Sequence, residues 1–165
     1  MPTEQINFYN STLKRYISFE ELIKEIANYI KAEPKADYRI TIGTDSPGVI
    51  MPFFVTAVTI LKIGNGGRYF WTKTGIVHCP TLRDRIYREV VLSITLTQEL
   101  KSRLKDVLGE DAFWNDKISV HLDVGQNGPT KDLIDGVVGM VKGYGFEAVI
   151  KPDSFCACIV ADKHT

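Results

Sequence analysis

The sequence predicts an α/β fold in which helices flank one mixed sheet of five strands. Two stretches rich in β-branched and aromatic residues, 51–63 and 68–77, are separated by the turn sequence Gly64-Asn-Gly-Gly67, which is typical of an antiparallel hairpin. Beyond the hairpin, helical and strand patterns alternate, as in sheets whose strands are joined by crossover helices. The length of 165 residues suits one domain. We therefore expect a single domain over 1–165, with 1–36 as an N-terminal helical extension.

A capping box and a strand that ends on a carboxylate define the N-terminal third of the chain. Ser18 and Glu21 can exchange hydrogen bonds at the start of a helix, and Pro34 ends the apolar helical spacing that follows. The segment 39–45 alternates as a strand does and places Asp45 at its C-terminal end, before a turn sequence. We expect this strand in the centre of the sheet. Asp45 can then be either a metal ligand on rigid backbone or the cap of a turn.

A long helix is predicted over 82–108, after a capping sequence. When its residues are placed about 100° apart, the apolar side chains gather on one side. Glu89 falls within that side, whereas Glu99 points away from it. A buried carboxylate is costly unless it is paired or binds a metal. Glu89 is therefore a candidate metal ligand, with a buried ion pair to Arg85 or Arg88 as the alternative.

A second strand, 117–123, also ends on a carboxylate, Asp123, and a loop with two glycines follows it. His121, on the polar side of this strand, can be a metal ligand, a proton-transfer residue or a structural hydrogen-bond partner. In the loop, the amides of Gln126 and Asn127 can contact the sugar or base edges of a substrate, or Asn127 can simply form the turn. We expect the two carboxylates at the strand ends to be neighbours.

The last quarter of the chain predicts a helix from Pro129, a short strand over 146–151 and a final helix near the C-terminus. Asp153 falls at the start of that final helix, where it can be a metal ligand or an N-cap. Asp162 lies nine positions further on, roughly 13.5 Å along the helix and on its opposite side, so one compact site cannot easily contain both. We expect Asp153 to be the fourth acidic ligand, with Asp162 and His164 further out.

Four motifs in this order resemble those of the ribonuclease H-like YkuK family, and the resemblance covers about residues 39–165. The motifs are Gly43-Thr-Asp-Ser46, Leu82-Arg-Asp-Arg-Ile-Tyr-Arg-Glu-Val90, His121-Leu-Asp-Val-Gly125 and Lys151-Pro-Asp-Ser154, with Val160-Ala-Asp-Lys-His-Thr165 at the end. The resemblance implies a ribonuclease H-like fold. It also implies that Asp45, Glu89, Asp123 and Asp153 are catalytic residues and metal ligands.

The resemblance implies a chemistry as well as a fold. Hydrolysis of a phosphodiester by two divalent ions requires hard oxygen ligands, which suit Mg²⁺ or Mn²⁺. We therefore expect a metal-dependent nuclease that acts on a nucleic acid, whether RNA, DNA or a hybrid. The alternative is a non-catalytic ribonuclease H-like module that binds nucleic acid or a protein partner.

The composition bears on partners and compartment. Twenty basic and twenty acidic residues give a formal net charge of zero, so contact with a polyanion must come from local basic patches. We expect a cytoplasmic protein without membrane contact, because the sequence shows neither a signal peptide nor an apolar run of ~20 residues. The three cysteines, Cys79, Cys156 and Cys158, lack the spacing of a CxxC pair, and we expect buried thiols rather than a zinc site.

Overall fold

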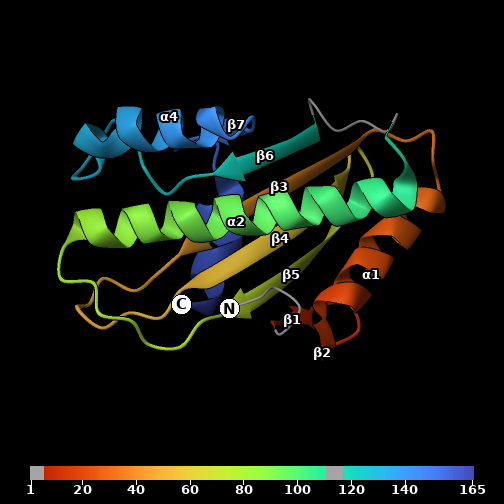
Figure 1. Cartoon of the computed structure of the whole chain (residues 1–165), viewed down its shortest axis with the longest axis horizontal. Helices are drawn as coiled ribbons and strands as arrows, with labels where there is room; N and C mark the ends of the chain where they lie inside the picture. The colour runs from red at the N-terminus through yellow and green to blue at the C-terminus, as the bar shows by residue number, and fades with distance from the viewer. Residues whose placement is uncertain (1–5, 111–116) are drawn as a thin grey trace.

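A computed structural model describes residues 6–110 and 117–165 and shows one seven-stranded mixed sheet flanked by helices (Figure 1). The order across the sheet is β2-β1-β5-β4-β3-β6-β7. The strands are β1 (Asn7–Asn10), β2 (Arg15–Ser18), β3 (Tyr38–Asp45), β4 (Val55–Lys62), β5 (Gly67–Lys73), β6 (Ile118–His121) and β7 (Glu147–Val149). The helices are α1 (Phe19–Lys31), α2 (Leu82–Leu108) and α4 (Ile134–Gly143), with the short segments η2 (Lys131–Leu133), η3 (Cys156–Ala161) and η4 (Asp162–His164).

The five predicted strands are present, and β3 is the middle one of them. It pairs antiparallel with β4 and parallel with β6, while β5 and β7 lie outside these two neighbours. The hairpin strands are shorter than predicted, because β4 begins at Val55 rather than 51 and β5 ends at Lys73 rather than 77. Beyond these ends, isolated hydrogen bonds join the two segments, such as that from the Val77 N–H to the Pro52 carbonyl at 2.8 Å.

The expected count of five strands is wrong, because a further hairpin, β1–β2, precedes the predicted helix within the N-terminal extension. β1 and β2 pair antiparallel, and β1 also pairs with the outer edge of β5. The Asn10 side chain holds the turn by accepting hydrogen bonds from the backbone N–H groups of Thr12 and Leu13, at 3.0 and 3.1 Å. The predicted helix follows as α1, with both hydrogen bonds of its capping box.

Helices α1 and α2 pack on one face of the sheet, as Figure 1 shows. The α2 helix has its predicted limits, and its apolar side turns toward the sheet. Burial of this face supplies the main core. Its fully buried side chains include Phe8, Leu22, Ile26, Ile40, Ile60, Phe70 and Leu100. Within the described part of the chain, the helices are too short or too polar to cross a membrane.

The C-terminal helix lies against the other face of the sheet, behind β3 and β4 in Figure 1. It starts later than predicted and is a π-helix, η3, that continues as the 3₁₀ turn η4. Gly43 permits its close approach, since a Cβ atom at this position would lie 2.6 Å from the backbone nitrogen of Ala157. The helix expected from Pro129 likewise begins only at η2. Most of the loop expected over 109–116 lies outside the described residues.

Candidate functional site

Two neighbouring strands bring Asp45 and Asp123 to the same edge of the sheet. Strands β3 and β6 are parallel, and their register pairs Gly43 with His121. Asp45 lies two residues after Gly43, and Asp123 lies two residues after His121, so both carboxylates follow the same register. Parallel strands deliver their carboxyl ends to one edge, so the predicted neighbourhood of these acids is confirmed.

Asp45 is buried with no basic partner among its described contacts. Only 7% of its surface is exposed. Burial, reinforced by the negative charges of Asp123 and Asp162, raises the pKa of Asp45 to about 7, although the Ser46 backbone N–H opposes this shift. The strand end thus holds a carboxyl group where its ionised form is unfavourable without a cation.

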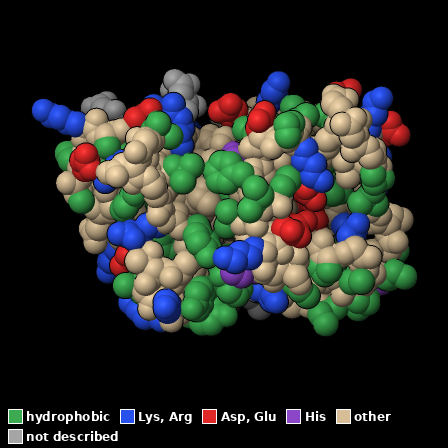
Figure 2. Space-filling model, turned by 180° about the vertical axis from the view of Figure 1, so that it is seen from behind, with side chains coloured by type: hydrophobic (Ala, Val, Ile, Leu, Met, Phe, Trp, Pro, Cys, Tyr) green, Lys and Arg blue, Asp and Glu red, His purple; other side chains and the backbone are tan. Residues whose placement is uncertain are grey.

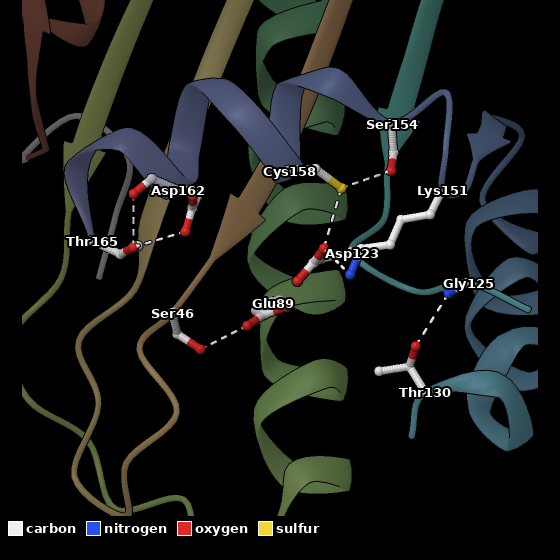
Figure 3. A network of polar contacts seen from close by, with 10 residues as sticks. All are labelled: Ser46, Glu89, Asp123, Gly125, Thr130, Lys151, Ser154, Cys158, Asp162 and Thr165. Carbon is white, nitrogen blue, oxygen red and sulfur yellow. Dashed lines mark hydrogen bonds and ion pairs between the residues drawn. The ribbon is translucent and has the colours of Figure 1, made fainter. Parts of the chain in front are cut away.

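Glu89 reaches the same place from α2 and is 5% exposed. Its Oε1 accepts a hydrogen bond of 2.6 Å from the Ser46 hydroxyl (Figure 3). Burial raises the pKa of Glu89 to about 8, and the charges of Asp45 and Asp123 add to the effect. The described residues include no salt bridge from Arg85 or Arg88 to Glu89. Arg85 donates to the Pro47 carbonyl at 2.9 Å, and its charge offsets only part of the rise in the Glu89 pKa.

Asp123 differs from these two acids because it has a cationic partner. Its Oδ1 accepts from the Lys151 ammonium at 2.8 Å and from the Cys158 thiol at 3.1 Å. Figure 3 shows the Asp123 carboxylate between Lys151 and Glu89, with the thiol above it. Hydrogen bonding to Asp123 raises the pKa of Lys151, so the lysine remains charged.

The Lys151 side chain is fixed by its surroundings. Its backbone N–H donates to the Val124 carbonyl at 2.9 Å. Its aliphatic stem passes over Gly125, where an added Cβ atom would lie 3.0 Å from the Lys151 Cβ. The Gly125 N–H in turn donates to the Thr130 hydroxyl at 3.1 Å. Sequence reasoning did not assign Lys151 a role, although it lies in one of the quoted motifs.

The structure brings Asp162, rather than Asp153, to the Asp45 carboxyl group. Asp162 forms a hydrogen bond with Asp45 and adds to the raised pKa of Asp45. Thr165 supports it by donating its hydroxyl to the Asp162 carbonyl at 2.8 Å. Asp153 is exposed in the turn before η3, because the helix begins two residues later than expected, and its charge acts on His121 instead.

His121 has a structural hydrogen bond rather than a position at the carboxylates. Its Nδ1 accepts from the Cys156 backbone N–H at 3.2 Å, and its ring lies edge-on to Phe155 at 4.7 Å. Burial lowers the pKa of His121 to about 4, so the ring is neutral at physiological pH. Of the alternatives for this residue, the structure supports the hydrogen-bond partner that positions η3.

Gln126 and Asn127 are exposed on the loop that follows Asp123. Their side chains form no hydrogen bond with any described residue. Gly128, with φ of 110°, completes the turn. The two amides are therefore available to a ligand on the loop that begins two residues after Asp123.

The fit of a divalent cation can be tested on these donors. Across residues 6–110 and 117–165, no three His, Cys, Asp or Glu side chains are arranged as a ready metal-binding group. The carboxyl oxygens of Asp45, Glu89, Asp123 and Asp162 nevertheless suit Mg²⁺ or Mn²⁺ in chemistry. The raised pKa values of Asp45 and Glu89 show acids that a cation would stabilise in ionised form. The donor chemistry is therefore compatible with such an ion, although Asp123 is paired with Lys151 in this structure. The three cysteines are free thiols, and Cys79 lies away from the carboxylates.

Comparison with known proteins identifies the family of the chain. A family model described as "Ribonuclease H-like" matches residues 21–165. The chain is 31% identical over 170 residues to "Uncharacterized protein YkuK" of Bacillus subtilis (strain 168), and the match covers 96% of each chain. No solved structure matches the chain. The resemblance to the ribonuclease H-like YkuK family is confirmed, and the β1–β2 hairpin lies outside the part that the family model matches.

Proposed function

This chain belongs to the ribonuclease H-like family, and we propose that it is a metal-dependent nuclease that hydrolyses phosphodiester bonds of a nucleic acid. The observation that supports the proposal is the convergence of Asp45, Glu89, Asp123 and Asp162 at one end of the sheet, where the nearby charges of Arg85 and Lys151 leave the pKa values of Glu89 and Asp45 raised. Acids brought together in this way repel one another unless positive charge is supplied. A fold of this kind alone would not define an activity.

Each acid has a defined place in this proposal. Asp45 and Asp123 would hold Mg²⁺ or Mn²⁺ from the two strand ends, with Glu89 and Asp162 completing the oxygen ligands. When bound, the divalent ions supply the charge that activates a water molecule and stabilises the leaving oxygen. The Ser46 hydroxyl orients Glu89. Lys151, which pairs with Asp123 in the absence of metal, would offer its positive charge to a phosphate oxygen once an ion is bound.

The exposed loop supplies a place for substrate beside the carboxylates. Gln126 and Asn127 have amide groups that can hydrogen-bond to sugar or base edges, and neither has another partner among the described residues. We expect a Gln126→Ala, Asn127→Ala double variant to bind substrate more weakly while it retains its fold. Unchanged substrate affinity in an active double variant would leave the loop as a simple turn.

A non-catalytic ribonuclease H-like module is the second candidate. The observation that favours it is the ion pair between Lys151 and Asp123, which gives one acid of the site an internal cation. Such a module would bind nucleic acid or a protein partner without cleaving it. Cleavage activity distinguishes the two candidates directly.

The test is a cleavage screen with Mg²⁺ or Mn²⁺ over single-stranded, duplex and hybrid substrates. We expect Asp45→Asn to lose at least about 100-fold in rate, as expected when a ligand of the reacting centre is removed. Asp106→Asn, an exposed acid at the far end of α2, is the matched control and should be unaffected. Metal-dependent cleavage that survives Asp45→Asn would exclude this site.

The same screen decides the fourth acid. Because Asp162 contacts Asp45 and Asp153 does not, we expect Asp162→Asn to reduce the rate about tenfold or more and Asp153→Asn to change it less than about twofold. Mn²⁺ affinity, measured by calorimetry, should follow the same order. The reverse order, with both variants folded, would assign the position to Asp153.

A further inference from the structure

Four aromatic rings form a continuous row across the sheet, and the nuclease proposal does not use them. The row consists of Tyr16 on β2, Tyr9 on β1, Trp71 on β5 and His164 on η4. Tyr9 is the direct cross-strand partner of both Tyr16 and Trp71, so these three side chains lie on the same face. Neighbouring ring centroids are 5.2 Å apart for Tyr16 and Tyr9, 5.5 Å for Tyr9 and Trp71, and 4.4 Å for Trp71 and His164.

The aromatic row is not a buried core. Tyr16 is 59% exposed, and the other three residues are half-buried. Phe8 and Ile17 of the same hairpin are instead fully buried on the opposite face and anchor the hairpin to the main core. The hairpin therefore has no need of Tyr16 for its own burial, and large exposed aromatic groups in contact with one another are typical of binding surfaces.

The aromatic row leads toward the carboxylates. His164 follows Asp162 by two residues on η4, and Asp162 contacts Asp45. Figure 2 views the molecule from the side opposite to Figure 1, and on this face acidic side chains gather at one place with lysine or arginine side chains close by. The far end of the row, Tyr16, lies on the outermost strand of the sheet.

Charge and hydrogen bonding add to the case for an anionic aromatic ligand. Lys73 and Lys163 are exposed, and both are near enough to His164 for their charges to act on it. Two ring nitrogens, Trp71 Nε1 and His164 Nε2, are buried without a hydrogen-bond partner among the described residues. Unsatisfied polar atoms of this kind are costly and call for a partner.

We propose that the aromatic row binds the bases of a single-stranded nucleic acid and directs its backbone to the carboxylate site. Unpaired bases have free faces that stack on aromatic side chains whatever their sequence, whereas a duplex hides these faces. The stacking of His164 on Trp71, with planes 18° apart, shows that this indole accepts a flat heterocycle. The two lysines match the charge of the phosphates, which a neutral protein partner would not need. This inference rests on the proposed nuclease function and names its substrate class.

Binding is measured by fluorescence anisotropy in EDTA, so that no cleavage occurs, with labelled dT20, rU20 and a 20-base-pair duplex. We expect both single strands to bind more tightly than the duplex. Tyr16→Ala should weaken single-strand binding about tenfold, the loss typical of one stacking ring, while Tyr16→Phe keeps the ring and should stay within about twofold. Thermal unfolding checks that Tyr16→Ala remains folded.

A second readout uses Trp71 itself. The other tryptophan, Trp114, lies outside the described residues, and Trp114→Phe leaves Trp71 as the sole indole. We expect dT20 to quench its fluorescence and the duplex to leave it unchanged. Equal affinity for duplex and single strands, or equal binding by Tyr16→Ala and wild type, would overturn the inference. So would a dimer in sedimentation that Tyr16→Ala dissociates, because a second copy would then cover the row.

These outcomes separate the inference from the nuclease proposal. Single-strand binding that depends on Tyr16, without cleavage under any metal condition, would support the aromatic row and refute the nuclease. Metal-dependent cleavage that is lost in Asp45→Asn but has the same KM in Tyr16→Ala would do the reverse. The preference between dT20 and rU20 identifies which single-stranded nucleic acid is bound.

Discussion

The carboxylates on the two sides of the site are stabilised in different ways. On the inner side, Asp45 and Glu89 are buried between β3 and α2, form no salt bridge with a described residue, and are stabilised chiefly by hydrogen bonds from Ser46, with a smaller effect of the Arg85 charge on Glu89. On the outer side, Asp123 has the ammonium of Lys151 and the thiol of Cys158. The inner side therefore opposes folding when it is ionised, while the outer side is stable without an added ion. This difference indicates that a bound cation would stabilise the inner acids most.

The largest expected effect is on the inner side and depends on pH. Because the folded-state pKa of Glu89 is raised from 4.5 to about 8, the stability contributed by its protonated form is complete below pH 4.5 and is lost as pH rises through about 8. We expect Glu89→Gln to be more stable than wild type by about 3 kcal/mol at pH 9 and nearly unchanged at pH 4. Urea unfolding in EDTA at the two pH values measures this.

The control for this prediction is Glu99→Gln on the same helix, which is half-buried away from the site. It should leave the dependence of stability on pH as in wild type. A Glu89→Gln variant that is equally or less stable than wild type at pH 9 would mean that the inner side already contains compensating charge.

The next largest effect is expected where helix η3, which carries Cys158 of the outer side, packs against β3. Helix η3 carries Cys158 and is followed by Asp162, and it rests on β3 at Gly43. We expect Gly43→Ala to destabilise the fold by about 2 kcal/mol, because its Cβ would collide with the backbone of Ala157. The control is Gly139→Ala on α4, which meets nothing within 4 Å and should stabilise that helix by about 0.5 kcal/mol. Similar unfolding midpoints for the two variants would show that η3 is displaced without cost.

The smallest effect is expected from Lys151→Gln, which removes the cation that pairs with Asp123 on the outer side. Lys151→Gln frees the Asp123 carboxylate, so we expect Mn²⁺ to bind about fivefold more tightly in calorimetry, since one positive charge no longer competes with it. The stability without metal should fall by less than about 1 kcal/mol, because the ion pair is partly exposed. Lys142→Gln, an exposed lysine on α4, is the control. Weaker Mn²⁺ binding by Lys151→Gln would mean that the lysine orders the site for the ion.

The inner side was accessible to sequence reasoning because local patterns determine it. Asp45 follows from the end of an alternating strand, and Glu89 follows from its place on the apolar side of a long helix. Asp123 was found by the same strand rule as Asp45. In each case one period, near two or near 3.6, fixes both the element and the direction of the side chain.

The parts that were missed depend on contacts between distant segments. The start of η3 is set by the hydrogen bond from the Cys156 N–H to His121, so the apolar spacing after Asp153 predicted a helix that begins too early. The N-terminal hairpin has strands of four residues, too short for a clear alternation. The one local signal was Asn10, whose side chain holds the turn. No local pattern could show that β1 pairs with β5.

The pairing of β1 with β5 also protects the molecule against association with other copies through an open sheet edge. Strand β5 has seven residues, and without the hairpin it would be an open edge able to recruit a strand from another copy. The hairpin covers part of this edge, helped by hydrogen bonds of 2.8 Å from Ser11 to Tyr69 and from Thr72 to Asn7. The sheet then ends in β2 and β7, of four and three residues, which offer little template for growth. Loss of the first 18 residues would therefore favour aggregation through β5 before it affected the carboxylates.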